Sequence, residues 1–339
     1  MLYRAVRPLL FTLDPEAAHS LSLDCLDVLA RLGAAPVLSC PVPRIPVRVM
    51  GLDFPNPVGL AAGMDKDGAH IDGLAALGFG FLEVGAVTPR PQPGNPGPRV
   101  FRLPEAEALI NRLGFNSRGV DVFVENIRRS RRGGIVGVNI GRNADTPNEK
   151  ALEDYAACLR KVYPYASFVT ANVSSPNTKN LRELQRADEL DAFLRALAAE
   201  RDRLAGQHGK RVPLAVKISP DLDDAGIEAV ADRVAARGIE AVIATNTTVS
   251  REGVEHLPSG REQGGLSGAP LKARATAVVA KLRRALPSGV AIIGVGGIAS
   301  AADAREKLDA GASLVQLYTA LVYRGPRIVS EIVRGLAAR

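Results

Sequence analysis

The stretch that decides the fold covers residues 214–245 and reads LAVKISPDLDDAGIEAVADRVAARGIEAVIAT. It begins with an apolar run from Leu214 to Ile218, continues with helical periodicity from Ala225 to Ala236, and ends with a second apolar run from Ala241 to Thr245. Short apolar runs that alternate with longer helical segments are typical of strand–helix–strand units in a parallel sheet. We therefore expect one such unit here.

The same alternation recurs from Pro57 onward in this chain of 339 residues, and helix-like segments such as Glu189 to Leu204 follow the apolar runs. The expected strands are Val58 to Ala61, Phe81 to Val84, Ile135 to Asn139, Phe168 to Asn172, Leu214 to Ile218, Ala241 to Thr245, Ala291 to Gly294 and Leu314 to Leu317. Eight such units favour an α/β fold of the (β/α)8 TIM-barrel class. An open doubly wound sheet is the alternative.

Residues 1–40 precede the repeat, and we expect them to form a short N-terminal extension of two helices, with residues 41–339 as the barrel domain. Helical patterns cover Tyr3 to Leu13 and Pro15 to Leu32, and Gly33 ends the second. Such helices can pack on the barrel, or lie on a membrane with their basic residues near anionic lipid. The pattern leaves both possibilities open.

Two other segments interrupt the repeat. Ile45 to Phe54 has the pattern of a hairpin with Gly51 near its turn, which we expect to close the barrel from below. Arg99 to Asn111 has the pattern of a strand pair inserted after the second barrel strand.

Composition excludes some classes of protein. With 46% hydrophobic and 23% charged residues, the chain is globular. Its net charge of +7 suits nucleic acid, anionic lipid or an anionic small ligand equally well. The three cysteines and four histidines have no metal-ligand spacing, so we expect no metal site and reduced thiols. Asp14 ends the first apolar run too early for a signal peptide, and no segment reaches the ~18 apolar residues of a membrane span.

Polar residues follow the expected strands, at the barrel end where active sites lie. They are Lys66, Asn139, Asn143, Asn172, Ser175, Asn177, Lys217, Thr245, Asn246 and Thr247. Because a carboxamide carries both a donor and an acceptor, the asparagines would complement the amide edges of a cyclic imide or pyrimidine. Each could instead be a turn or cap residue, and Ser175 before Pro176 has the pattern of a cap at the start of a helix.

The loops after the last two expected strands favour a phosphorylated ligand. Gly294 to Ile298 is rich in glycine and precedes a helix, and Tyr318-Thr319 ends the eighth strand. These two loops form the habitual phosphate site of TIM barrels, where bare backbone amides approach the ligand. No histidine lies in a visible triad motif, so hydrolase chemistry gains no support.

Several motifs together make the sequence resemble the quinone-linked, class 2 dihydroorotate dehydrogenases over nearly its whole length. They are Ala61 to Lys66 (AAGMDK), Val87 to Gln92 (VTPRPQ), Asn111 to Asn116 (NRLGFN), Asn139 to Gly141, Asn172 to Asn177 (NVSSPN), Asn246 to Thr248, Gly264 to Gly268 (GGLSG) and Gly294 to Ile298. The resemblance implies oxidation of (S)-dihydroorotate to orotate in pyrimidine (UMP) biosynthesis, with FMN as hydride acceptor and a membrane quinone as final electron acceptor.

The resemblance also assigns binding residues. The flavin contacts fall on Ala62, Gly63, Lys66, Ala86, Asn139, Asn172, Lys217, Thr245, Gly268, Gly297, Tyr318 and Thr319. The substrate contacts fall on Lys66, Asn111, Arg112, Leu113, Gly114, Phe115, Asn172, Asn177, Asn246 and Thr247. Two positions depart from the family pattern, since Ala86 replaces a usual flavin-contacting threonine and Arg142 a usual lysine. The first departure could remove a hydrogen bond worth about 1 kcal/mol.

In the family, a serine at the position of Ser175 takes a proton from C5 of the substrate while hydride passes from C6 to flavin N5. The fumarate- and NAD-linked relatives have cysteine there, so serine indicates class 2. The N-terminal helices form the quinone entrance in class 2 enzymes, and His19, Arg102 and Tyr318 correspond to polar residues near that tunnel. The resemblance therefore predicts a monomer attached peripherally to the cytoplasmic side of the cell membrane through these helices, with no nucleic-acid partner.

Two alternatives belong to other classes. A tRNA dihydrouridine synthase would share the flavin and the barrel, but those enzymes use a cysteine acid and add a C-terminal RNA-binding domain, whereas the expected last barrel helix, Arg327 to Ala338, ends this sequence. A non-catalytic flavin-binding protein would tolerate the loss of Lys66, Asn111 and Ser175, which are all present.

Overall fold

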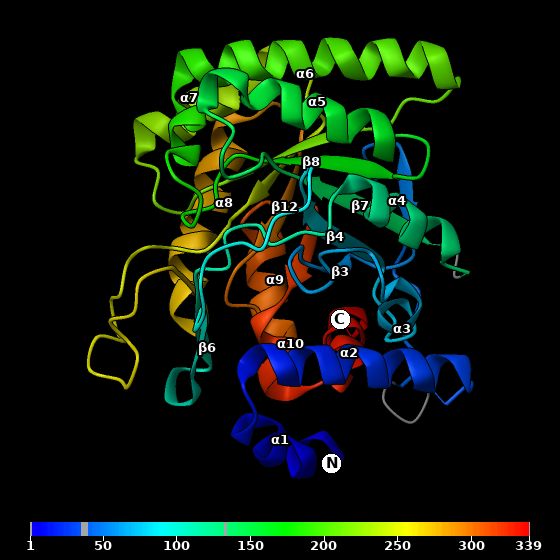
Figure 1. Ribbon diagram of the computed structural model, residues 1–339, viewed down its shortest axis with the longest axis vertical. Helices are drawn as coiled ribbons and strands as arrows, with labels where there is room; N and C mark the ends of the chain where they lie inside the picture. The colour runs from blue at the N-terminus through cyan, green and yellow to red at the C-terminus, as the bar shows by residue number, and fades with distance from the viewer. Residues whose placement is uncertain (1, 35–39, 132–133, 339) are drawn as a thin grey trace.

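A closed barrel of eight parallel strands forms the centre of the computed structural model, which describes residues 2–34, 40–131 and 134–338 (Figure 1). In chain order the barrel strands are β3 (Val58–Leu60), β4 (Phe81–Val87), β7 (Ile135–Ile140), β8 (Phe168–Asn172), β9 (Leu214–Ile218), β10 (Ala241–Ala244), β12 (Ala291–Val295) and β13 (Leu314–Leu317). Pairing of β13 with β3 closes the barrel. The predicted TIM barrel is thereby confirmed, and the open sheet is excluded.

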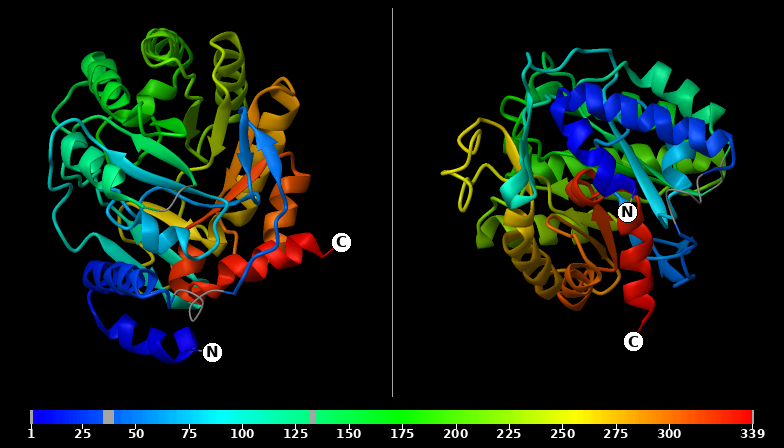
Figure 2. Two further views of the ribbon diagram at one scale, coloured as in Figure 1. Left: turned by 90° about the vertical axis from the view of Figure 1, so that its right-hand side faces the viewer. Right: turned by 90° about the horizontal axis from the view of Figure 1, so that it is seen from below.

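Helices surround the barrel on the outside (Figure 2). They are α3 (Ile71–Ala75), α4 (Val120–Arg129), α5 (Ala151–Val162), α6 (Ala187–His208), α7 (Asp224–Ala236), α8 (Lys272–Ala285), α9 (Ala301–Asp309), α10 (Thr319–Arg324) and α11 (Arg327–Ala337), with short 3-10 helices at Pro104–Ala106, Asn148–Lys150, Leu181–Gln185 and Ala269–Leu271. Local signals fix several ends. The Asp223 carboxylate accepts the Gly226 amide at the start of α7, and Gly209 ends α6 in the left-handed conformation.

Aromatic rings fill the amino-terminal end of the barrel. Phe81 lies 5.2 Å from Phe54 and 6.1 Å from Phe168 between ring centroids, both in edge-to-face geometry. Two glycines make the space, because a Cβ atom at Gly59 would lie 2.3 Å from the Phe81 ring and one at Gly137 would lie 2.1 Å from the Phe168 ring. The barrel interior is therefore solid at this end, and a ligand has room only at the other.

The hairpin predicted for residues 45–54 is present as β1 (Val47–Val49) and β2 (Leu52–Phe54), which are antiparallel. Phe54 carries it into the aromatic cluster, so it closes the barrel from below as expected. The inserted pair is also confirmed, as β5 (Val100–Leu103) and β6 (Ala108–Asn111). A third strand, β11 (Gly265–Gly268), joins β6 and was not expected, because half of its four residues are glycine.

Two N-terminal helices, α1 (Leu2–Thr12) and α2 (Pro15–Arg31), pack against one side of the barrel (Figure 1). The Asp27 carboxylate on α2 accepts the Gly73 amide and lies 2.7 Å from His70 Nδ1, which attaches α2 to α3. Part of their apolar surface nevertheless faces outward, since Leu9 is 69% exposed and Val28 52%. Packing on the barrel is thus observed without excluding a membrane role. Residues 1 and 35–39 of the expected 1–40 module lie outside the described residues.

Within the described ranges, no helix is long and apolar enough to cross a bilayer.

Candidate active site

A cavity opens at the carboxyl ends of the barrel strands, as the fold class requires. Nearly all of the predicted flavin and substrate residues line it, together with Ser175. The two exceptions are Asn139, whose amide nitrogen bonds the Glu83 carboxylate below the cavity, and Arg112, which pairs with Glu262 at 2.7 Å outside it. The structure therefore gathers segments from across the chain around one hollow.

Carboxamides form part of the cavity wall and bond one another. Asn172 Nδ2 donates to Asn139 Oδ1 at 3.0 Å, and Asn246 Nδ2 donates to Asn172 Oδ1 at 3.3 Å. Asn177 Nδ2 donates to Asn111 Oδ1 at 3.2 Å. These contacts hold the amides as a set of oriented donors and acceptors. Asn143, another strand-end candidate, is engaged elsewhere, because its side chain bonds both the amide and the carbonyl of Arg90.

Ser175 lies on the loop after β8 and is 6% exposed. Its hydroxyl oxygen accepts the Asn177 amide at 3.3 Å, so the residue does cap a turn, but no helix begins at Pro176 as the cap alternative required. No carboxylate or imidazole within the described ranges contacts this hydroxyl. Its proton is therefore not committed to a protein acceptor.

Two lysines enter the cavity without an anionic partner. Lys217 on β9 is 5% exposed, and no described residue forms a contact ion pair with its ammonium group or with that of Lys66. Burial lowers the pKa of Lys66 to about 8, against the raising effect of the Glu16 carboxylate. Unpaired buried charges are costly in the free protein. An anionic ligand would remove that cost.

The glycine loop after β12 provides close backbone approach. Gly296 and Gly297 have φ angles of 113° and 71°, and both line the cavity. A Cβ atom at Gly297 would lie 2.5 Å from the Lys272 Cα atom at the start of α8, so no larger residue fits there. With the two free lysines, this loop fits a phosphorylated cofactor that carries negative charge.

Comparison with known proteins identifies the family. A family model described as dihydroorotate dehydrogenase matches residues 44–339. A Nitrosomonas eutropha protein named dihydroorotate dehydrogenase (quinone) is 58% identical over 100% of this chain and 98% of its own length. One from Burkholderia multivorans with the same name is 61% identical over 99% and 97%. The chain belongs to the dihydroorotate dehydrogenase family.

The solved structures agree. A crystal structure of DHODH from Eimeria tenella in complex with ferulenol superposes with a TM-score of 0.86 at 39% identity, covering 95% of this chain and 90% of that one. A ligand-free DHODH from the same organism gives 0.84 at 40% identity, covering 93% of each chain. Membership in the dihydroorotate dehydrogenase family decides against a tRNA dihydrouridine synthase.

Both departures from the dihydroorotate dehydrogenase pattern have a defined place. Arg142 is 2% exposed and donates to Asn148 and to the carbonyls of Asn143, Thr146 and Lys179, so it braces a loop. The methyl group of Ala86 lines the cavity, where a threonine would have offered a hydroxyl. The predicted loss of one cofactor hydrogen bond at Ala86 stays a prediction.

A second cavity adjoins the first beneath the N-terminal helices. His19, Arg102 and Tyr318 line it, and Tyr318, Lys66 and Leu113 line both cavities. Burial and the nearby Lys66 charge lower the pKa of His19 to about 4, so its imidazole is neutral at pH 7. Burial raises the pKa of Tyr318 to about 12, which keeps the phenol protonated. Arg102 is already engaged, since it donates to the carbonyls of Phe11 and Leu13.

Among the cavity-lining residues that the sequence did not single out, Gln316 is the polar residue that is buried inside a barrel strand. Gln316 lines the first cavity from the middle of β13. The available signal was a polar residue inside the apolar run Leu314 to Leu317, which is costly to bury without a function or a partner.

Because Lys217 is buried without an anionic partner among the described residues, it should lower the free energy of unfolding of the flavin-free protein. Lys217→Met should stabilise the flavin-free protein by about 0.5–2 kcal/mol, because a buried charge without a partner is removed. Urea unfolding of the flavin-free variants measures this change. The control is Lys161→Met, which removes an exposed lysine paired with Asp121 at 2.5 Å and should shift stability by less than about 0.5 kcal/mol. A destabilised Lys217→Met protein would contradict the interpretation.

Proposed function

We propose that this protein oxidises (S)-dihydroorotate to orotate with FMN as hydride acceptor and a membrane quinone as final electron acceptor, in pyrimidine biosynthesis. The observation that carries the proposal is the meeting of Ser175, Lys66, Lys217 and oriented carboxamides in one cavity, in a chain of this family. Bound FMN would supply the redox chemistry. The chain's own residues would bind and orient the cofactor and the substrate, and Ser175 would take the substrate proton.

We assign the cofactor to the cavity side formed by Lys217 and the last two barrel loops. The proposed flavin contacts are Ala62, Gly63, Lys66, Ala86, Asn172, Lys217, Thr245, Gly268, Gly297, Tyr318 and Thr319. Lys217 would place positive charge beside the anionic reduced flavin. The structure places Asn139 one hydrogen bond away from the cavity, so its proposed role is to orient Asn172.

The substrate carboxylate is assigned to the Lys66 ammonium, and the ring amides to the carboxamides of Asn111, Asn172, Asn177 and Asn246. Arg112 turns away toward Glu262 and does not line the cavity, so no substrate contact is assigned to it. Ser175 is the proposed base for the substrate C5 proton. A serine hydroxyl is a weak base at its ordinary pKa, so as it takes the C5 proton its own proton must pass to a water molecule and from there to solvent.

The defining experiment uses the purified, flavin-loaded protein under anaerobic conditions. Dihydroorotate should bleach the flavin absorbance, and a quinone added afterwards should restore it. A flavin that dihydroorotate does not reduce would overturn the proposed function, and it would leave a non-catalytic flavin-binding protein as the remaining explanation.

The same assay tests Ser175. Ser175→Ala should slow flavin reduction by about 10²–10⁴-fold while flavin content and orotate affinity stay near those of the parent protein, since only the proton-accepting group is lost. Stopped-flow reduction gives the rate, and orotate titration gives the affinity. An unchanged reduction rate would remove Ser175 from the mechanism.

Lys66 predicts a pH dependence for orotate binding. Its ammonium is charged below a pKa of about 8 in the ligand-free cavity, so affinity for the carboxylate should be constant at lower pH and fall as pH rises above that value. Negative charge on the bound cofactor would raise this pKa and move the fall to higher pH. Lys66→Met should bind orotate weakly without the inflection. The same affinity and the same pH profile in Lys66→Met and in the parent protein would contradict the assignment.

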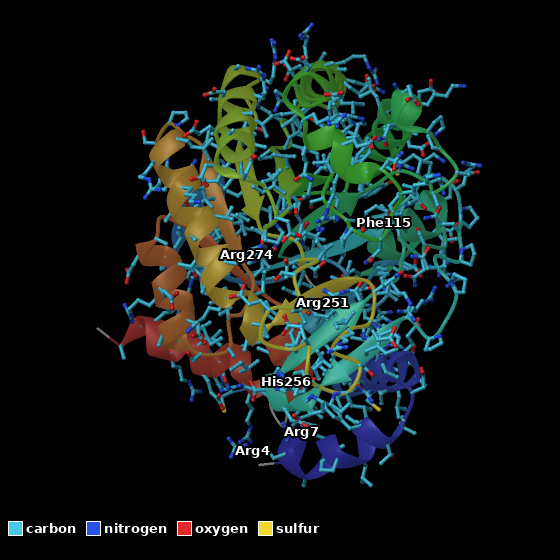
Figure 3. The ribbon with its side chains drawn as sticks, turned by 90° about the vertical axis from the view of Figure 1, so that its left-hand side faces the viewer. Arg4, Arg7, Phe115, Arg251, His256 and Arg274 are labelled. Atoms are coloured by element: carbon cyan, nitrogen blue, oxygen red, sulfur yellow. The ribbon has the colours of Figure 1, made fainter. Side chains whose placement is uncertain are left out.

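We further propose that α1 and α2 attach the protein peripherally to the cytoplasmic face of the cell membrane as a monomer and admit the quinone to the second cavity. Support comes from the exposed leucines on these helices, from the second cavity beneath them and from Arg4, which extends from α1 at the edge of the molecule (Figure 3). The module of residues 1–40 would then be a separate functional unit beside the barrel of residues 41–339.

Deleting residues 1–40 should therefore spare flavin reduction by dihydroorotate and impair reoxidation by a long-chain quinone. The two half-reactions are measured separately on folded, flavin-loaded protein, with liposome sedimentation alongside. Because deletion exposes barrel surface beneath α2, a milder variant is the matched control. The double substitution Leu9→Ser and Val28→Ser removes exposed apolar groups outside both cavities and should weaken liposome binding alone. A truncation with normal quinone turnover would defeat the entrance proposal.

A further inference from the structure

A buried carboxylate lies inside the barrel between the aromatic cluster and the cavity. Glu83 on β4 is fully buried, and each of its carboxylate oxygens accepts one amide hydrogen bond of 2.6 Å. One donor is Asn139 Nδ2 on β7, and the other is Gln316 Nε2 on β13. An ionised carboxylate can only accept hydrogen bonds, and bonds of this kind are among the stronger ones in proteins.

This contact fixes which way the Gln316 amide points. Because Nε2 must face the Glu83 carboxylate, Oε1 is turned away from it. Gln316 is 1% exposed and lines the cavity, yet no described residue donates to its Oε1 atom. A buried acceptor without a partner costs about 1–3 kcal/mol. The described residues thus leave an acceptor in the wall of the cavity without a protein donor.

Glu83 also fixes the orientation of the Asn139 amide, and through it the orientation of the Asn172 amide. With its nitrogen on Glu83, Asn139 can offer only Oδ1 to Asn172, and Asn172 Nδ2 occupies that acceptor at 3.0 Å. Asn172 Oδ1 is then left to accept from Asn246 Nδ2. One buried side chain therefore orients carboxamides on several strands of the barrel.

We propose that Gln316 is a further binding residue of this cavity, whose Oε1 accepts a hydrogen bond from an N–H or hydroxyl donor of the bound cofactor, and that Glu83 is the positioning residue that fixes this polarity. The inference rests on the proposed function, because FMN is the occupant considered. FMN carries both kinds of donor, a ring imide N–H and the hydroxyls of its sugar chain. A ligand without a donor at this point would leave the acceptor unsatisfied.

The test exchanges hydrogen-bond donors and acceptors at positions 83 and 316 while the shapes of the side chains stay nearly constant. Glu83→Gln puts a donor where both neighbours expect an acceptor, so either the Gln316 or the Asn139 amide must turn over. When Gln316 turns, it presents a donor to the cofactor's donor. In the double variant Glu83→Gln with Gln316→Glu, the new carboxamide at position 83 can accept from Asn139 and donate to position 316, which leaves an acceptor oxygen toward the cavity. The double variant should therefore reverse the defect of the single one.

The readout is the Kd of FMN for flavin-free protein, from quenching of flavin fluorescence, with urea unfolding of the same samples. Glu83→Gln should raise the Kd about 5- to 10-fold, the loss of one neutral hydrogen bond, and the double variant should recover most of that loss. The control is Thr170→Val, which removes a hydroxyl that is also buried without a partner but does not line the cavity. Its Kd should equal that of the parent protein.

The outcomes separate the two proposals. A parent protein that does not bind FMN defeats the proposed function. FMN binding by the parent together with a Kd within twofold in Glu83→Gln overturns the inference alone. The inference also fails if the double variant binds as weakly as Glu83→Gln, because amide polarity would then not be what the cofactor senses. Gln316→Met, which removes the acceptor outright, should match the Kd of Glu83→Gln if it folds.

Discussion

The two ends of one barrel interior have opposite chemistry, and the rest of the structure depends on that division. Phe54, Phe81 and Phe168 fill the amino-terminal end, and the absence of side chains at Gly59 and Gly137 lets the rings interlock. Immediately toward the cavity, the barrel changes to the buried Glu83 and its amide donors. A solid apolar base below a hydrogen-bonded polar layer gives the cavity a rigid floor, which a site that depends on amide orientation requires.

The cavity above this rigid floor contains charged and polar groups that have no protein partner among the described residues. Lys66, Lys217 and Gln316 all hold charge or an acceptor that the described protein does not satisfy. Each makes the free chain less stable than an apolar residue of similar size would. Such groups belong where a ligand completes them, and their concentration in one cavity is stronger evidence for a binding site than the hollow itself.

Much of this arrangement could be read from the sequence, because the signals were periodic. Every apolar run expected as a barrel strand is one, because parallel strands that are buried on both faces are recognisable as short runs in which apolar residues predominate. The strand β11 was missed because Gly265 and Gly268 weaken its pattern and only pairing with β6 makes it a strand. For the site, strand-end residues gave Ser175, Lys66 and the asparagines. Gln316 and Glu83 lie inside the strands, and their roles depend on partners far away in the sequence.

The wall between the two cavities is a single layer of side chains. Tyr318, Lys66 and Leu113 have one surface in each cavity. On the proposed assignment, these three side chains would be what separates a cofactor in the inner cavity from a quinone in the outer one. Because these side chains face both cavities, a molecule bound in the outer cavity would contact the wall of the inner one. An inhibitor of the outer cavity could therefore reveal itself as a change in the colour of the flavin.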